Sequence, residues 1–249
     1  MGLLGSIFGG KRSQLEPFDL SLIKADMHSH LIPGIDDGSK SIDESIVMLA
    51  KFESLGYKKV ITTPHIMSDY FRNSPETILP GLDTLRNTAK ELGLTIQIDA
   101  AAEYYFDESL MDKLRNKIPL MTFGDKYVLF EFSFHDAPSQ IDALFFEFLT
   151  QDYKPVLAHF ERYPYFFGDL KKAKEWREKG INIQMNLNSL SGNYGPEVKK
   201  QAELLIDHQL IDFVGSDCHR IEHLLMLEDN LRNPYMHKLA DLPLKNQSL

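Results

Sequence analysis

Residues 24–38 read KADMHSHLIPGIDDG and combine a strand signal with a cluster of polar side chains. An apolar run leads into His28 and His30, and a loop that contains Asp36 and Asp37 follows. Side chains two residues apart on a strand share one face, so both histidines can point at the same site. The stretch predicts a short strand whose carboxyl end delivers metal ligands.

A helix is predicted directly after this loop, and the same order of strand and helix recurs along the chain. Ser41 and Glu44 form a capping-box pair at the start of that helix, and Gly56 ends it. Strands are predicted at Ile23–His28, Lys59–Thr63, Thr95–Ala101, Tyr127–Phe132, Pro155–His159, Ile181–Leu187 and Phe213–Ser216. Helices are predicted at Ser41–Leu55, Pro75–Leu92, Glu108–Asn116, Ser139–Gln151, Asp169–Lys179 and Pro196–His208.

Alternation of strands and helices indicates a parallel sheet in an α/β fold. For a chain of 249 residues, closure of these units into a TIM-like barrel is the most economical arrangement. An open, doubly wound sheet is the main alternative. Neither a G-x-G-x-x-G motif nor a Walker loop supports a nucleotide-binding version of that sheet.

The composition excludes several classes of function. The chain carries a net charge of −9, which disfavours binding to a phosphate backbone. It has a single cysteine, so no internal disulfide can form, and a reducing, cytoplasmic compartment fits best. No apolar run approaches the roughly 18 residues of a membrane span.

The N-terminal residues differ from the rest of the chain. Residues 1–20 are predicted to form a flexible arm, and residues 21–249 a single catalytic domain. The arm begins with MGLLGS, which fits the short myristoylation pattern M-G-x-x-x-[ST]. A mobile arm that touches a membrane or a neighbouring protein is the simpler interpretation.

Six of the seven predicted strands end in histidine, glutamate or aspartate. Functional residues of parallel α/β folds gather at this edge of the sheet. Imidazole and carboxylate ligands without thiolates suit Mn²⁺, Fe or Zn²⁺ in catalytic sites. So many groups predict two or three ions, with Glu103 and Asp217 as shared or terminal ligands. The candidate ligands are His28, His30, Asp37, His65, Glu103, Glu131, His159, Asp217 and His219.

Single members of this set are weak evidence, since Glu131 alone would more often be a salt-bridge partner. The hypothesis rests on their joint placement. The remaining histidines lie away from the strand ends and are interpreted as surface or packing residues: His135, His208, His223 and His237. Asp26 precedes His28 by two residues and is predicted to orient an imidazole.

The motifs DMHSH, DDG, TTPH, AEYY, FEFS, AHFERY and SDCH occur in this order between Lys24 and His219. Together they resemble the PHP (polymerase and histidinol phosphatase) superfamily. Within it they are most similar to the bacterial manganese-dependent protein-tyrosine phosphatases of capsule and exopolysaccharide systems. The runs HFERY and IPGIDDGS are typical of that branch.

The resemblance implies a distorted (β/α)₇ barrel with a trinuclear centre held by the nine candidate ligands, with Asp37 chosen over Asp36. It implies that Arg162 contacts phosphate and acts in catalysis with Asp217 and His219. Mn²⁺ is the first candidate metal, with Fe and Zn²⁺ as alternatives. The run CHRIEHLLML departs from the branch, whose second phosphate-binding arginine has only Arg220 as a counterpart here.

The implied reaction is hydrolysis of protein phosphotyrosine by a hydroxide that bridges two metal ions, which lower the pKa of its parent water. The implied partner is a bacterial tyrosine kinase with a tyrosine-rich tail, at the inner face of the membrane. A homo-oligomer is left open. The alternatives are a PHP phosphatase for a small metabolite such as histidinol phosphate, an amidohydrolase-type hydrolase, a PHP exonuclease and a non-catalytic metal-binding regulator.

Two further groups of residues have competing interpretations. Six aromatic residues near the strand ends either wall a slot for a phenyl ring or pack in the core: Tyr104, Tyr105, Phe132, Phe134, Phe160 and Tyr163. Cys218 would be a nucleophile in a C-x₅-R motif, but Leu224 occupies the arginine position. Cys218 is therefore interpreted as a small residue between two ligands.

Overall fold

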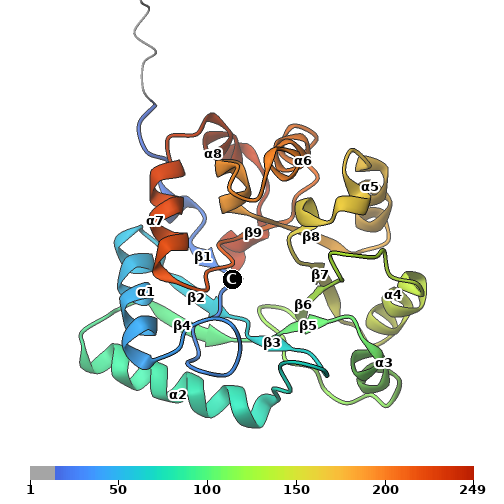
Figure 1. Cartoon of the computed structure of the whole chain (residues 1–249), viewed down its shortest axis with the longest axis horizontal. Coiled ribbons are helices and arrows are strands. Elements are labelled where there is room, and N and C mark those ends of the chain that lie inside the picture. The colour runs from blue at the N-terminus through green and yellow to red at the C-terminus, as the bar shows by residue number, and fades with distance from the viewer. Residues whose placement is uncertain (1–14) are drawn as a thin grey trace, which may run out of the picture.

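The computed structural model describes residues 15–249, and its centre is a curled parallel sheet ringed by helices (Figure 1). The strands are β1 (Ala25–Asp26), β2 (Lys59–Thr62), β3 (His65–Ile66), β4 (Gln97–Ala100), β5 (Glu103–Tyr105), β6 (Tyr127–Glu131), β7 (Lys154–Leu157), β8 (Asn182–Asn186) and β9 (Phe213–Gly215). The helices are α1 (Ile42–Ser54), α2 (Pro75–Glu91), α3 (Glu108–Arg115), α4 (Ile141–Thr150), α5 (Leu170–Glu178), α6 (Pro196–Asp207), α7 (Ile221–Asn230) and α8 (Pro234–Lys238). The predicted TIM-like α/β architecture is confirmed.

Two of the predicted strands, Lys59–Thr63 and Thr95–Ala101, are each followed, after a bend, by a second short strand that was not predicted. Thr63 and Pro64 separate β2 from β3, and Ala101 and Ala102 separate β4 from β5. Pro64 has no N–H to donate to a ladder, so the regular pairing stops there. One group of strands then has the order β1-β2-β4, and the other has the order β3-β5-β6-β7-β8-β9. Every pairing is parallel.

The sheet curls until the segments that follow β1 and β9 meet. Asp217 N donates to His28 O and His30 N donates to Cys218 O, both at 2.8 Å. Ser29 and Cys218 thereby form a parallel bridge. The first and last predicted ligand pairs lie side by side as a result.

A side chain closes the opposite end of the same seam. Asn246 is fully buried in the 3₁₀ segment η6 (Lys245–Ser248). Its Nδ2 donates to Ala25 O and Val214 O, and its Oδ1 accepts from Val214 N. The C-terminal segment therefore supplies the hydrogen bonds that a neighbouring strand would otherwise make to β1 and β9.

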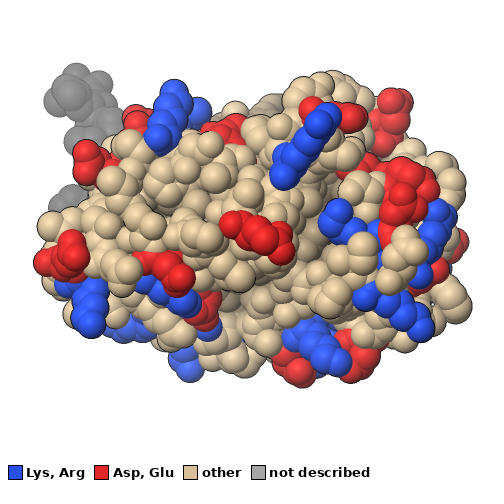
Figure 2. Space-filling view, turned by 90° about the horizontal axis from the view of Figure 1, so that it is seen from below, with Lys and Arg blue, Asp and Glu red and all other residues tan. Residues whose placement is uncertain are grey.

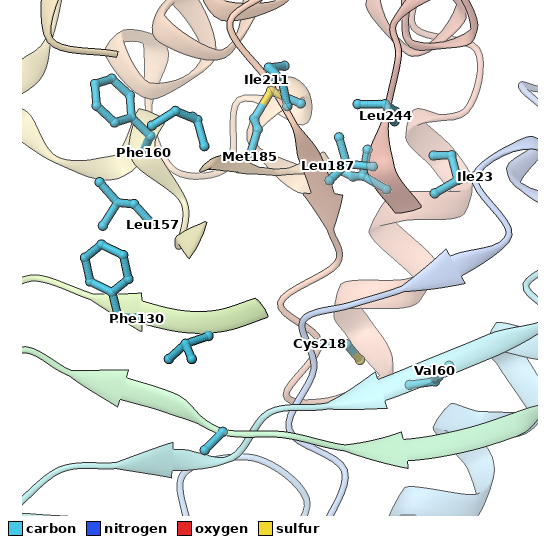
Figure 3. Packing of buried hydrophobic residues seen from close by; sticks show 14 of the residues in the cluster. Ile23, Val60, Phe130, Leu157, Phe160, Met185, Leu187, Ile211, Cys218 and Leu244 are labelled. Atoms are coloured by element: carbon cyan, nitrogen blue, oxygen red, sulfur yellow. The ribbon is translucent and has the colours of Figure 1, made fainter. Parts of the chain in front are cut away.

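Outward-facing side chains of the sheet pack against the surrounding helices. Phe130 of β6 and Leu157 of β7 are paired residues and lie next to each other (Figure 3). The Phe130 ring lies 5.4 Å from the Phe148 ring of α4, centroid to centroid. A second, smaller cluster fills the inside of the barrel: Met27, Ile61, Ala101, Phe123, Leu129, Val156, Ala158 and Phe213. These apolar layers fix the strands whose carboxyl ends carry the polar residues.

The surface shows no single-sign charge on the face drawn in Figure 2, where lysine and arginine alternate with aspartate and glutamate over its described residues. The net charge of −9 is therefore not gathered into one acidic patch on this face. Among residues 15–249, no helix combines the length and the apolar character that crossing a lipid bilayer requires.

Two expectations need correction. Phe18 and Leu20 are buried, and Phe18 N donates to Leu231 O at 2.9 Å, so the arm predicted over residues 1–20 is too long. Its MGLLGS pattern lies outside the described residues. The helices α7 and α8 are not predicted from the sequence. Arg220, at the N-cap of α7, makes no side-chain capping bond, so the usual start signal is missing there.

Candidate metal centre

The nine predicted ligands lie together at the carboxyl ends of the strands. Seven of them line one cleft of about 270 Å³, and His28 and His30 lie buried beneath it. A larger hollow, of about 930 Å³, lies near the starts of β6 to β9 and contains none of the nine. The chemistry of the lining, and not the size of the hollow, singles out the smaller cleft.

Glu103 is the central carboxylate of the cluster. It follows the bend between β4 and β5 and is 1% exposed. Its Oε2 lies 3.1 Å from His28 Nε2 and 3.3 Å from both His30 Nε2 and His65 Nδ1. Its Oε1 lies 3.1 Å from His159 Nε2. Burial alone would raise the pKa of Glu103, but the histidines, led by His28 and His65, hold it well below its usual value.

Asp217 is a second buried carboxylate beside the first. Its Oδ1 lies 3.4 Å from both His28 Nε2 and His219 Nδ1. Its Oδ2 accepts from Arg162 Nη1 at 2.9 Å and from Asn186 Nδ2 at 2.8 Å. Burial opposes ionisation, but the neighbouring imidazoles and Arg162 hold the pKa of Asp217 well below its usual value.

The two neighbouring aspartates of the first loop have different surroundings. Asp36 Oδ2 accepts from His30 Nδ1 at 2.7 Å and from His65 N at 3.1 Å, and its side chain is fully buried. Asp37 is 57% exposed, and its Oδ1 lies 3.3 Å from His219 Nε2 and 3.6 Å from His65 Nε2. Asp36 therefore fixes an imidazole, whereas Asp37 faces the cleft.

Two imidazoles are oriented so that one ring nitrogen remains available. His28 Nδ1 lies 3.2 Å from Gln184 Oε1, and His30 Nδ1 lies 2.7 Å from Asp36. An oxygen acceptor at Nδ1 places the proton there and leaves the Nε2 lone pair free, as in metal-binding histidines. Both Nε2 atoms point at Glu103 and Asp217.

The donor set fits divalent ions. Four groups of potential ligand atoms each lie within 4.8 Å of one another: His30, Asp37, His65 and His219; His28, His30 and Glu103; His28, His159 and Asp217; and His65, Glu103 and Glu131. Within the described chain, the buried His30 Nε2 and His65 Nδ1 have no hydrogen-bond partner of good geometry. Such orphaned ring nitrogens beside carboxylates are typical of imidazoles that bind a cation.

The raised pKa values of two cluster histidines indicate the same need for positive charge near the carboxylates. Burial lowers the pKa of His28, but Glu103 and Asp217 outweigh it and raise the pKa to about 9. The balance is the same at His65, where burial is outweighed mainly by Glu103 and Glu131 and the pKa is about 9. Cations bound among the carboxylates would replace these protons.

Comparison with known proteins agrees with the motifs. Residues 24–245 match the family described as "Capsular polysaccharide synthesis, CpsB/CapC". The chain belongs to the CpsB/CapC family. It is 30% identical to the tyrosine-protein phosphatase CpsB of Streptococcus pneumoniae over 87% of this chain and 88% of the relative. It is 28% identical to the tyrosine-protein phosphatase YwqE of Bacillus subtilis over 90% and 92%.

The fold agrees as well. A solved structure from work on Bacillus subtilis YwqE and Streptococcus pneumoniae CpsB, described as "unique metal-dependent tyrosine phosphatases", superposes with a TM-score of 0.74. The match has 26% sequence identity and covers 89% of this chain and 94% of the other. A lactonase from Listeria monocytogenes, 14% identical, superposes over 94% of both chains with a TM-score of 0.53 and shares the fold alone.

In this CpsB/CapC chain the interpretation of His223 as a surface or packing residue is wrong. His223 lines the cleft, and its Nδ1 lies 3.2 Å from Asp217 O and 3.3 Å from His219 N. It reaches the site because α7 begins at Ile221, directly after the SDCH motif. Tyr194, which is not among the predicted site residues, lines the cleft from the loop before α6.

The arginines lie in different environments. Arg162 pairs with Asp217, and its guanidinium contacts two rings, 4.7 Å from the Phe134 centroid and 4.6 Å from that of Tyr194. Arg220 also lines the cleft, but its side chain is 70% exposed, and its Nε lies 4.0 Å from Glu222. Arg162 is therefore held in place, whereas Arg220 lies at the open rim.

The six aromatic residues divide between the two interpretations. Tyr104, Phe132, Phe160 and Tyr163 are at most 2% exposed and belong to the main core, so the wall interpretation is wrong for these four. The Phe132 and Phe160 rings lie 6.2 and 6.1 Å from the Trp176 ring of α5, centroid to centroid. Phe134 lines the cleft, whereas Tyr105 is partly buried and belongs neither to the lining of the cleft nor to the core clusters.

The expected role of Asp26 is wrong, whereas that of Cys218 as a small packing residue fits the structure. Asp26 was expected to orient an imidazole, but it accepts from Ser216 N and Ser216 Oγ, at 2.7 and 3.1 Å. It thus fixes the turn that follows β9. Cys218 is fully buried and is a small core residue, with Sγ 3.5 Å from Met48 Sδ (Figure 3).

Proposed function

We propose that this chain is a metal-dependent protein-tyrosine phosphatase whose nine predicted ligands hold two or three divalent ions. The observation that carries the proposal is the pair of buried carboxylates, Glu103 and Asp217, ringed by imidazoles and adjoining a clamped arginine. Membership of the CpsB/CapC family supports it, because relatives over most of the chain are named tyrosine-protein phosphatases.

The metal roles follow the four ligand groups. His30, Asp37, His65 and His219 would hold one ion at the open side, and Glu103 would be shared by groups on either side of it. Ions bound there would supply Lewis-acid polarisation of the phosphoryl oxygens. Oxygen and nitrogen ligands without thiolate suit Mn²⁺, Fe or Zn²⁺. The resemblance to manganese-dependent phosphatases puts Mn²⁺ first among them.

The chain's own side chains have separate tasks. Arg162 would bind a phosphate oxygen, since a guanidinium has five N–H donors and Asp217 accepts from one of them. Asn186 and Arg162 together hold Asp217 Oδ2, which leaves Oδ1 to face the imidazoles. His219 and Arg220 line the rim where the leaving group would depart.

A protein substrate is favoured over a small metabolite because the cleft is not closed. Two further grooves, of about 560 and 430 Å³, share lining residues with it. A tyrosine kinase with a tyrosine-rich tail is the proposed partner. The proposed location is the cytoplasm, at the inner face of the membrane through that kinase, which fits the single buried cysteine.

The decisive experiment is a phosphatase assay after chelation and add-back of Mn²⁺, Fe²⁺ or Zn²⁺. Phosphotyrosine peptide, phosphoserine peptide and histidinol phosphate are compared side by side. We expect activity to disappear on chelation, to return with Mn²⁺ and to favour phosphotyrosine. Activity that survives removal of all metal would refute the metal centre, and faster hydrolysis of histidinol phosphate would refute the protein substrate.

Matched variants test the residues. His159→Gln changes a cluster histidine, and His208→Gln makes the same change at an exposed histidine outside the cluster. We expect the first to lose activity and bound metal and the second to retain both. Equal behaviour of the two variants would contradict the assignment.

A further inference from the structure

The metal cleft continues into an apolar groove beside Arg162. This groove has a volume of about 430 Å³, and its apolar lining comes from Pro164, Phe167, Tyr194, Pro196 and Val198. Phe134, Arg162 and Tyr194 line both the cleft and the groove. A phosphate bound at Arg162 would therefore lie where the two hollows meet.

The groove is built from restrained backbone. Pro164 begins a 3₁₀ turn in which Phe167 N donates to Pro164 O at 3.2 Å. Pro196 occupies the first position of α6, and Val198 lies in the first turn of that helix, 7% exposed. Fixed φ angles at the two prolines keep these walls apart with little conformational freedom. The groove is thus present without rearrangement.

The two sides of the cleft differ in chemistry. The apolar groove has one acidic residue, Glu197, at its edge and otherwise presents rings and an aliphatic side chain around Arg162. The groove on the other side of His219, between α1 and α7, is lined by charged residues such as Lys40, Asp43, Glu44 and Glu222. A polypeptide that places its phosphotyrosine in the cleft would meet different surfaces with its two flanks.

We propose that the groove formed by Pro164, Phe167, Tyr194, Pro196 and Val198 binds an apolar side chain of the substrate polypeptide close to the phosphotyrosine. The inference rests on the proposed function, and it adds a sequence preference to it. The groove is continuous with the cleft, because Phe134 and Tyr194, which contact the phosphate-binding Arg162, also line the end of the groove next to the cleft. An apolar side chain there would bury surface that is otherwise in contact with water.

The test compares phosphotyrosine peptides that differ at one position. A leucine or a serine is placed one, two or three residues before or after the phosphotyrosine, in an otherwise identical peptide. We expect leucine on one side to raise kcat/KM roughly tenfold over serine, mainly through KM. In Phe167→Ser this leucine-to-serine ratio should fall toward one, and a second variant, Val198→Ser, should lower it as well.

The ratio is measured within each variant, so a general loss of activity or of folded protein cancels. Phe146→Ser makes the same change at a phenylalanine of α4 that is 64% exposed and does not line the groove, and it should keep the ratio. A ratio of one in the native protein, a preference for aspartate over leucine, or an undiminished ratio in both groove variants would overturn the inference. Failure of the proposed function would look different, since the manganese-loaded native protein would then hydrolyse neither these peptides nor p-nitrophenyl phosphate.

Discussion

Asp36 and Asp37 are chemically identical neighbours whose surroundings give them different tasks. Burial raises the pKa of Asp36, but His30 outweighs it and lowers the pKa to about 2, so the carboxylate stays charged against the ring that it orients. Asp37 is half exposed, and a hydrogen bond from His219 lowers its pKa. One aspartate thus positions an imidazole and the other is free to bind an ion.

Separate Asn variants test this division. Asp37→Asn should lower the number of bound ions, because it removes a charged ligand at the open side of the cluster. Asp36→Asn should keep the number at saturating metal but weaken affinity by roughly 10–100-fold, as loss of a partner that orients a ligand does. Elemental analysis and metal titration of the purified variants measure both quantities. The reverse pattern would mean that Asp36 is the ligand.

Tyr194 is predicted to matter through Arg162. The Tyr194 ring lies 4.6 Å and the Phe134 ring 4.7 Å from the guanidinium, so both rings limit the positions that the arginine can take. Loss of one cation–π contact of about 1 kcal/mol predicts roughly fivefold lower kcat/KM in Tyr194→Leu. Tyr194→Phe keeps the ring and is the matched control. Steady-state rates with p-nitrophenyl phosphate provide the measurement, and a leucine variant as active as the phenylalanine variant would contradict the role.

Cys218 should prove dispensable for the reaction. Burial raises the pKa of its thiol well above the usual value, so the nucleophilic thiolate is not available near neutral pH. Cys218→Ser should retain most activity in the phosphotyrosine assay. A variant that is inactive while metal-loaded and folded would instead point to chemistry at the sulfur.

At the scale of elements, the strand ends could be predicted because an apolar run followed by a polar ligand is a local pattern. The bends at Pro64 and after Ala101 could not be placed in the same way, since they depend on which strands pair. His223 lies away from the predicted strand ends, and the helix α7 that brings it to the cleft lacks a capping signal in the sequence. Gln184 and Asn186 gave no metal-ligand signal, because their roles come from contacts with residues far along the chain.

The position of the segment η6 also depends on contacts with residues far along the chain, since Asn246 bonds to Ala25 and Val214. These contacts predict an effect on stability. Asn246→Ala would leave Ala25 O and the N–H and O of Val214 without their partner in a buried seam. Unsatisfied buried groups cost about 1–3 kcal/mol each, so for three groups we expect a loss of at least about 3 kcal/mol in the free energy of unfolding. Urea denaturation measures it. Gln247→Ala, at an exposed neighbour, should change little, and equal stability of both variants would show that η6 does not close the barrel.

At the scale of the whole molecule, two negative charges are buried close together in the interior of the protein. Glu103 and Asp217 are buried and ionised, and positive charge must accompany them. Without metal, protons on His28, His30, His65 and His219 supply this charge, because nearby carboxylates raise the pKa of each of these histidines although burial alone would lower it. Metal ions and protons therefore compete for the same nitrogen atoms.

This competition predicts opposite pH trends for the metal-free and metal-loaded protein. The pKa values of His28 and His65 are about 9 and that of His219 about 8, all above the usual 6.5. Their stabilising contribution to the metal-free protein is fully present below about pH 6.5 and is lost as the pH rises through 8 and 9. The increase in Tm on adding Mn²⁺ should accordingly be larger at pH 8.5 than at pH 6, and calorimetry in buffers of different ionisation enthalpy should detect released protons. A Tm increase that is the same at both pH values, with no proton release, would show that the ions do not replace protons on these histidines.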